Sequence, residues 1–235
     1  MKNSVLVVAA HPDDELLGCG GTLLRHVAQG DQVHIMILAE GLTSRDQARD
    51  AVGRADDLKV LHAASQQAAD ALGAQSLRMY SFPDNRMDGM ELLDVVKCVE
   101  DRIVDIHPNI IYTHHAGDVN VDHYVTHRAV ITAARSLPGA EARRLLFFET
   151  VSSTEWQMPR AAEAFLPNYY VEIGDVLAKK LELLHYYEGE MREFPHPRSY
   201  RGVEGLARYR GQTVGVEYAE AFCLGRQMIS AKEQI

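Results

Sequence analysis

The sequence of 235 residues has few cysteines and no cysteine motif that would bind a metal or form a disulfide framework. Its three cysteines, Cys19, Cys98 and Cys223, are odd in number and widely spaced, with no CxxC pair. This pattern is typical of a reducing compartment, and it excludes a zinc site built from cysteine alone. A GxSxG nucleophile elbow is also missing, which excludes the serine hydrolases that use that turn.

Long apolar runs and an excess of positive charge are missing as well. No apolar stretch approaches the roughly 18 residues needed to cross a bilayer. The apolar run over residues 4–10 is too short for a signal peptide and leads into charged residues, not into a small-residue cleavage site. The net charge is −9, which argues against a nucleic-acid-binding surface. We therefore predict a cytoplasmic protein with no membrane span and no nucleic-acid partner.

Apolar and amphipathic segments alternate along the chain. Continuous apolar runs indicate buried strands, and apolar residues at helical spacing indicate the helices between them. We expect strands over residues 4–10, 32–40, 77–82, 109–114, 143–150 and 168–173. We expect helices over residues 16–30, 44–72, 91–106, 123–137 and 176–191. Since no linker or repeat interrupts this pattern, we predict that residues 1–235 form a single Rossmann-like α/β domain. Its sheet should be mostly parallel and flanked by helices on both faces.

Two polar, histidine-rich loops follow the first and the fourth predicted strands. Residues 11–15 read HPDDE, and residues 114–123 read HHAGDVNVDH. In sheets of this class the order 3-2-1-4-5 is common, so the first and fourth strands lie side by side. Ligands then bind outside the carboxyl ends of these two strands, where the winding reverses. This order predicts that both loops line one crevice.

The residue types in these loops indicate a catalytic metal centre. His11 and Asp14 are three residues apart, which places them on one side of a helical turn, and we expect His123 to complete the set. Two histidines and a carboxylate, with one position left for water, are typical of catalytic zinc. Asp13 is then free to accept a proton from the attacking water, as hydrolysis of an unreactive amide requires. The same ligands also suit a non-haem iron oxygenase, which ligand type alone does not exclude.

Simpler interpretations compete with catalysis at several of these residues. Acidic residues near a helix start are worth ~0.3–1 kcal/mol each, and we assign Glu15 that structural role. Asp122 can either cap the following helix or belong to the site. The stretch GCGGTL imitates a dinucleotide-binding fingerprint, but the carboxylates of the preceding turn would repel a pyrophosphate. A non-catalytic sugar-binding or nucleotide-binding protein on the same fold is a further alternative.

At AAHPDDELLGCGGTL, residues 9–23, the sequence resembles the LmbE-like, PIG-L-type family of zinc-dependent N-deacetylases. The resemblance continues through FPDNRMD, THHAGDVNVDH and the region from FPHPRS to EYAEAF, so it covers almost the whole chain. It implies hydrolysis of the N-acetyl group of a small amino sugar or its conjugate, with one Zn²⁺ per chain. It also implies that His11, Asp14 and His123 bind the zinc and that Asp13 is the base.

One departure from the family pattern concerns the oxyanion. Many members have HPDH where this chain has NVDH at residues 120–123, and the first histidine there is thought to stabilise the oxyanion. We expect Asn120 to replace it by donating a neutral hydrogen bond, or His115 or His196 to act instead.

A second departure concerns the substrate. A family arginine that contacts the sugar is replaced here by Leu61, and Arg54 or Arg45 can take that role. Arg198, in a loop bounded by two prolines with His196, can contact an anionic or hydroxylated substrate, and His115 is a further candidate. The sequence leaves open which sugar is used and whether the chain forms a homo-oligomer.

Overall fold

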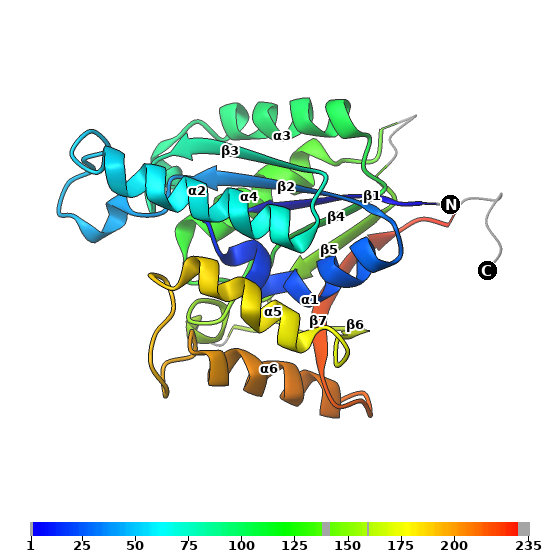
Figure 1. Cartoon of the computed structure of the whole chain (residues 1–235). Coiled ribbons are helices and arrows are strands. Elements are labelled where there is room, and N and C mark those ends of the chain that lie inside the picture. The colour runs from blue at the N-terminus through cyan, green and yellow to red at the C-terminus, as the bar shows by residue number, and fades with distance from the viewer. Residues whose placement is uncertain (1, 138–141, 159, 230–235) are drawn as a thin grey trace.

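The computed structural model describes residues 2–137, 142–158 and 160–229. Within these residues seven strands form one sheet: β1 (Ser4–Ala9), β2 (Gln32–Ala39), β3 (Ser76–Phe82), β4 (Ile110–His114), β5 (Arg144–Phe148), β6 (Tyr169–Glu172) and β7 (Ala219–Gln227). Their order is β3-β2-β1-β4-β5-β7-β6 (Figure 1). The first five strands are parallel, and β7 runs antiparallel to both β5 and β6.

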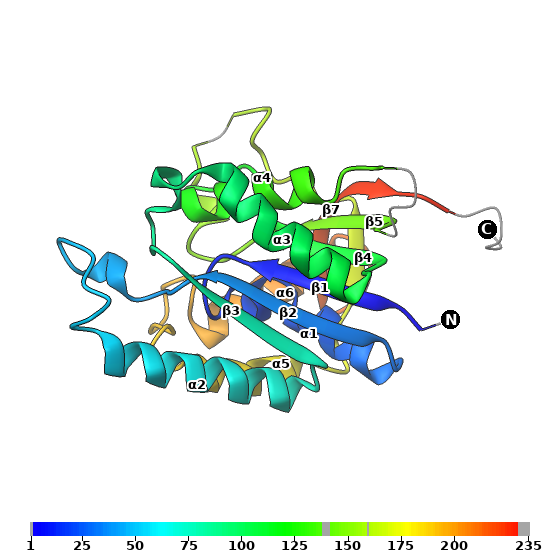
Figure 2. The ribbon, with the colours of Figure 1, turned by 90° about the horizontal axis from the view of Figure 1, so that it is seen from above.

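Helices cover both faces of the sheet, as Figure 2 shows from above. The described residues contain six α-helices: α1 (Asp14–Ala28), α2 (Ala55–Leu72), α3 (Leu92–Ile106), α4 (Val121–Ala133), α5 (Leu177–Leu183) and α6 (Tyr200–Gln212). Four short 3-10 helices join them: η1 (Thr43–Arg45), η2 (Met87–Gly89), η3 (Thr154–Trp156) and η4 (Leu184–Tyr187). Two helices, α3 and α4, pack on one face, and α1, α2, α5 and α6 pack on the other.

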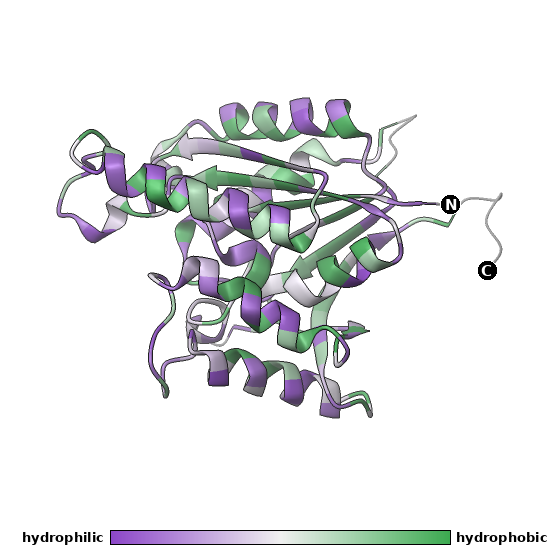
Figure 3. Cartoon of the chain, in the orientation of Figure 1, coloured by the Kyte–Doolittle hydropathy of each residue, from purple (hydrophilic) through white to green (hydrophobic). Residues whose placement is uncertain are grey.

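The alternation of side chains along β1 explains the two hydrophobic cores. Val5 and Val7 point toward α1 and α2, whereas Leu6 and Val8 point toward α3 and α4. All four are fully buried because the strand is covered on both sides. Figure 3 shows largely apolar strands inside the molecule and helices that carry both polar and apolar residues around them.

The predicted fold class is confirmed, and so is the predicted order of the first five strands. The prediction was wrong over residues 46–54, which are not helical; α2 begins only at Ala55. Side chains hold this segment in another conformation. Asp50 accepts the N–H of Gly53, and Arg49 and Arg54 form ion pairs with Glu40 and Asp46.

The sequence analysis did not predict the last two elements of the described chain, the helix α6 and the strand β7. The apolar residues of α6 are separated by charged residues and glycines, and the nine-residue β7 contains Gly225 and Arg226 among its apolar residues. The helix expected over residues 176–191 is also shorter, with α5 followed by the 3-10 helix η4. No helix among the described residues is both long and apolar enough to cross a membrane.

Candidate active site

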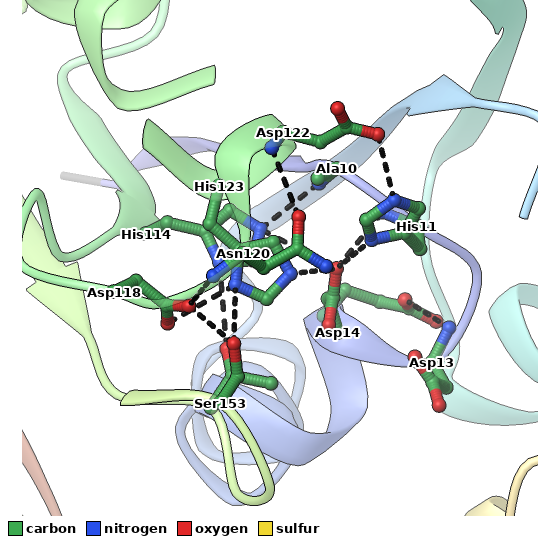
Figure 4. Close-up of polar contacts among 12 residues, drawn as sticks. Ala10, His11, Asp13, Asp14, His114, Asp118, Asn120, Asp122, His123 and Ser153 are labelled. Carbon is green, nitrogen blue, oxygen red and sulfur yellow. Dashed lines mark hydrogen bonds and ion pairs between the residues drawn. The ribbon is translucent and has the colours of Figure 1, made fainter. Parts of the chain in front are cut away.

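The two histidine-rich loops meet at the carboxyl ends of β1 and β4. These strands pair in parallel, with Val8 opposite Thr113, so the residues that follow them emerge side by side. The loop after β1 and the first turn of α1 supply His11 and Asp14, and α4 supplies His123 (Figure 4). The structure therefore brings together the three residues that the sequence predicted to bind a metal.

One carboxylate oxygen of Asp14 is the meeting point of this group. It lies 3.2 Å from Nδ1 of His11 and 3.2 Å from Nε2 of His123. All three residues are buried, and their donor atoms lie within 4.8 Å of one another. In a tetrahedral zinc site with bonds of about 2.0–2.1 Å, neighbouring ligand atoms are about 3.3 Å apart. The donor types and their spacing thus fit a zinc ion.

Three further aspartates orient the two imidazole rings. Nδ1 of His123 lies 3.1 Å from Asp118, so its Nε2 faces Asp14. Nε2 of His11 lies 3.0 Å from Asp122 and 3.2 Å from Asp84, so its Nδ1 faces Asp14. Carboxylates behind histidine ligands commonly fix the ring and its tautomer in this way.

The contacts of Asp122 settle its role. Its carboxylate accepts the N–H groups of Asn85 (2.6 Å) and Met87 (2.9 Å) in addition to contacting His11. Asp122 therefore supports the site instead of capping α4. Asp84 and Asp118 were not predicted, because nothing in their local spacing distinguishes them from loop aspartates. His11, Asp84 and Asp122 form a second group of possible metal donors, but backbone N–H groups already donate to both carboxylates.

The charges of this cluster favour a cation. Burial raises the pKa of Asp14, but His123 and His114 outweigh burial and hold that pKa well below its usual value. Burial lowers the pKa of His123, yet Asp14 and Asp118 together raise it to about 9. The carboxylates thus create a negative potential that draws protons to the imidazoles, and a metal ion would be drawn by the same potential.

Asp13 lies beside this cluster and is also buried, with 1% of its surface exposed. Burial raises the pKa of Asp13 well above its usual value, and the guanidinium of Arg198, 3.2 Å away, opposes this. Its backbone is left-handed (φ 107°), a conformation that costs about 1–3 kcal/mol in a residue with a side chain and is typical of functional sites. Glu15 accepts the N–H of Asp13 and the hydroxyl of Tyr187, and so holds this turn in place.

Asn120 caps α4, which fixes the direction of its side chain. Its Oδ1 accepts the N–H of Asp122 at 2.9 Å. With the oxygen engaged, the amide nitrogen points toward Asp14 and His11 (Figure 4). A neutral hydrogen-bond donor therefore faces the place where the metal donors meet.

Only some of the residues predicted to contact the substrate lie near the cluster of possible metal donors. Arg198 reaches Asp13 and also lies 3.8 Å from Glu190. His196 accepts the N–H of Arg198, and its ring contacts Trp156. His115 lies apart from the cluster: its Nε2 is 3.0 Å from the carbonyl of residue 163, and its ring edge meets Phe165.

A groove of about 390 Å³ lies between α2 and η4, and its size is typical of small-molecule sites. Arg45 and Arg54 line it, together with Leu61. Both arginines are paired within the protein, Arg45 with Glu190 at 2.6 Å and Arg54 with Asp46 at 2.7 Å. Glu190 links the groove to the site, since it also lies near Arg198.

The fold and this donor set define an α/β protein with a buried site that could hold a metal. The family model PIG-L, described as GlcNAc-PI de-N-acetylase, matches residues 6–134, and the chain belongs to this family. The resemblance inferred from the sequence motifs is thus confirmed.

Two curated relatives are deacetylases by name. The Escherichia coli protein named uncharacterized deacetylase YaiS is 28% identical over 174 residues, which cover 72% of this chain and 85% of that protein. A probable N-acetyl-alpha-D-glucosaminyl L-malate deacetylase 2 of Bacillus anthracis is 27% identical over 198 residues, which cover 81% of this chain and 83% of that protein.

Solved structures share the whole fold. The N,N'-diacetylchitobiose deacetylase of Pyrococcus horikoshii superposes with a TM-score of 0.75 at 18% identity, over 95% of this chain and 84% of that chain. GalB, the 4-carboxy-2-hydroxymuconate hydratase of Pseudomonas putida, superposes with a TM-score of 0.76 at 22% identity over the full length of both chains. Because the second enzyme is a hydratase, the fold alone does not specify the reaction.

Proposed function

We propose that this protein hydrolyses the N-acetyl group of an amino sugar or amino-sugar conjugate, with one Zn²⁺ held by His11, Asp14 and His123. The observation that carries the proposal is the convergence of these three donor atoms beside the buried carboxylate of Asp13. The family description and the name of the Bacillus anthracis relative both specify an N-acetylglucosamine unit, which supports an amino sugar as the substrate class.

Zinc, when bound, supplies a Lewis acid that polarises the acetamide carbonyl and acidifies water. Asp13 accepts the proton of the water that attacks the acetamide carbon. The amide nitrogen of Asn120 donates a hydrogen bond to the carbonyl oxygen as that oxygen becomes negative. Asp13 then returns the proton to the amide nitrogen while the C–N bond breaks, and acetate and the free amine leave.

Arg198 and the groove complete the proposal. Arg198 opposes the burial that raises the pKa of Asp13, and so favours the carboxylate form that can accept a proton. The groove is linked to Asp13 through Glu190 and Arg198, and it offers a place for the rest of the sugar or its conjugate. Arg45 and Arg54 in its lining and Arg198 beyond it supply polar contacts. His115 and His196 remain candidates for such contacts only if the substrate extends beyond this groove.

We also propose that residues 1–235 act as a single domain in the cytoplasm. Its three cysteines are free, in keeping with a reducing compartment.

A screen for acetate release tests the function. The zinc-loaded protein is incubated with N-acetylglucosamine conjugates, and acetate and free amine are measured together, with Asp13→Asn as the inactive control. We expect both products in equal amounts. Stoichiometric iron with oxygen-dependent turnover of a 2-oxo acid would instead identify an oxygenase. Tight binding of an N-acetylated sugar without acetate release would identify a binding protein.

A further inference from the structure

The helix α1 contains a bend close to the turn that carries Asp13 and Asp14. Cys19 has a non-helical backbone (φ −147°, ψ 17°), so α1 consists of a first segment over residues 14–18 and a second segment that follows Cys19. Figure 1 shows the change of direction. The first segment carries Asp14, and Asp13 directly precedes it. Its orientation therefore determines where both carboxylates lie.

The bend leaves helix ends inside the protein, away from water, where their backbone groups need other partners. The N–H groups of Gly21 and Thr22, after the bend, donate to the carboxylate of Glu220 at 2.8 and 2.7 Å. The Thr22 hydroxyl donates to the same carboxylate at 2.6 Å. The carbonyl of Leu17, before the bend, accepts a hydrogen bond from Nζ of Lys180 at 2.9 Å. An anion thus faces the start of one segment and a cation faces the end of the other, as the helix dipole favours.

Lys180 and Glu220 also bind each other at 2.6 Å, and their side chains are only 3% and 5% exposed. They come from α5 and β7, far along the chain from α1. A buried ion pair gives little net stability compared with well-packed apolar residues. The pair is therefore better explained by its contacts with α1 than by its own attraction.

We propose that Lys180 and Glu220 are positioning residues for Asp14: they hold the bend in α1, and the bend sets Asp14 against His11 and His123. The inference rests on the proposed function in so far as Asp14 is a metal ligand. Its signature is the direction of the charges, because Glu220 accepts from Gly21 and Thr22 and Lys180 donates to Leu17. With the two side chains exchanged, an ammonium would face N–H donors and a carboxylate would face a carbonyl acceptor, so neither hydrogen bond could form.

Charge variants test this proposal with two readouts. Lys180→Met and Glu220→Gln each remove one charge, and the double variant Lys180→Glu with Glu220→Lys keeps a pair with reversed direction. Zinc affinity is measured by competition with a chelator, and hydrogen exchange of the Gly21 and Thr22 amides is measured without metal. We expect the single variants to lose roughly 10- to 100-fold in zinc affinity, the range for residues that support metal ligands. The two amides should exchange faster, and the reversed pair should restore neither property.

Arg210→Met is the matched control. Arg210 forms a largely buried ion pair with Glu149 at 2.6 Å near the same place but with no hydrogen bond to α1. Its loss should lower thermal stability and leave zinc affinity unchanged. Restoration of zinc affinity by the reversed pair would overturn the proposal, as would single variants that bind zinc like the parent.

Two results separate this inference from the proposed function. If the parent protein binds no zinc, the proposed function is contradicted. The hydrogen exchange of the Gly21 and Thr22 amides, which is measured without metal, still tests whether Lys180 and Glu220 hold the bend. Unchanged exchange in Glu220→Gln then overturns the positioning role. If Lys180→Met does not fold, Glu220→Gln and Thr22→Val provide the same comparison.

Discussion

At the scale of single residues, Asp13 and Asp14 are chemically alike but have different surroundings. Asp14 lies between two imidazoles, whereas Asp13 faces Arg198. We therefore expect Asp14→Ala to lose both zinc and activity. Asp13→Asn keeps the shape but cannot accept a proton, so zinc should remain while turnover falls ~100- to 10,000-fold. Zinc content and acetate release are measured for both variants. Loss of zinc from Asp13→Asn with retention by Asp14→Ala would mean that the two roles are reversed.

Asn120 does two things that substitutions can separate. Its oxygen caps α4, and its amide nitrogen faces the site. Asn120→Ala removes both, so turnover should fall about 100-fold and stability by about 1 kcal/mol. Asn120→Ser keeps a capping oxygen but has no amide donor, so turnover should fall similarly with stability nearly unchanged. Normal turnover in Asn120→Ser would show that another group stabilises the oxyanion.

At the scale of elements, the glycines of α1 allow the helix to lie close to the sheet. A Cβ at Gly18 would lie 2.3 Å from the ring of Phe148, whereas the nearest atom to a Cβ at Gly20 would be 3.4 Å away. Gly18→Ala should therefore destabilise the protein by about 1–3 kcal/mol through overpacking. Gly20→Ala, the control, should be neutral or stabilising by up to about 1 kcal/mol because alanine favours helix. Chemical denaturation of both variants measures the difference, and equal stabilities would contradict the packing argument.

Sequence patterns predicted some elements well and others not at all. β1, β2 and β4 are covered on both faces, so their continuous apolar runs marked them clearly. β7 depends on pairing with β5 and β6, which are distant in sequence, and no local pattern encodes that pairing. The bend in α1 is similar, because its partners Lys180 and Glu220 come from the far end of the chain.

At the scale of the whole molecule, the topology explains how much of the site was predictable. The strand order places the loops after β1 and β4 together, so His11, Asp14 and His123 could be predicted from their residue types and position. Asp84 reaches His11 from a loop distant in sequence, and Asp118 reaches His123 through the fold of the short loop before α4, which residue spacing alone does not reveal. The contact of Arg198 with Asp13 arises for the same reason from a distant loop.

The buried His127 makes the free energy of unfolding depend on pH. Burial lowers the pKa of His127, which donates a hydrogen bond to the carbonyl of His114. Its folded pKa lies below the unfolded value of 6.5, so the unfolded state binds the proton more readily. The stabilisation is complete above about pH 6.5 and is lost as the pH falls below it. In the metal-free protein, the difference in Tm between the parent and His127→Gln should therefore be smaller at pH 5.5 than at pH 7.5. A difference that is constant or grows in acid would contradict this assignment.

The most direct test of the account is to remove and restore the metal while acetate release is measured. The purified protein should contain about one zinc per chain, and a chelator should remove zinc and activity together. Adding one equivalent of Zn²⁺ should restore acetate release from an N-acetylated amino sugar in the parent but not in Asp13→Asn, although that variant rebinds the ion. Full activity in protein shown to be free of metal would contradict the account, as would acetate release by Asp13→Asn at the parent's rate.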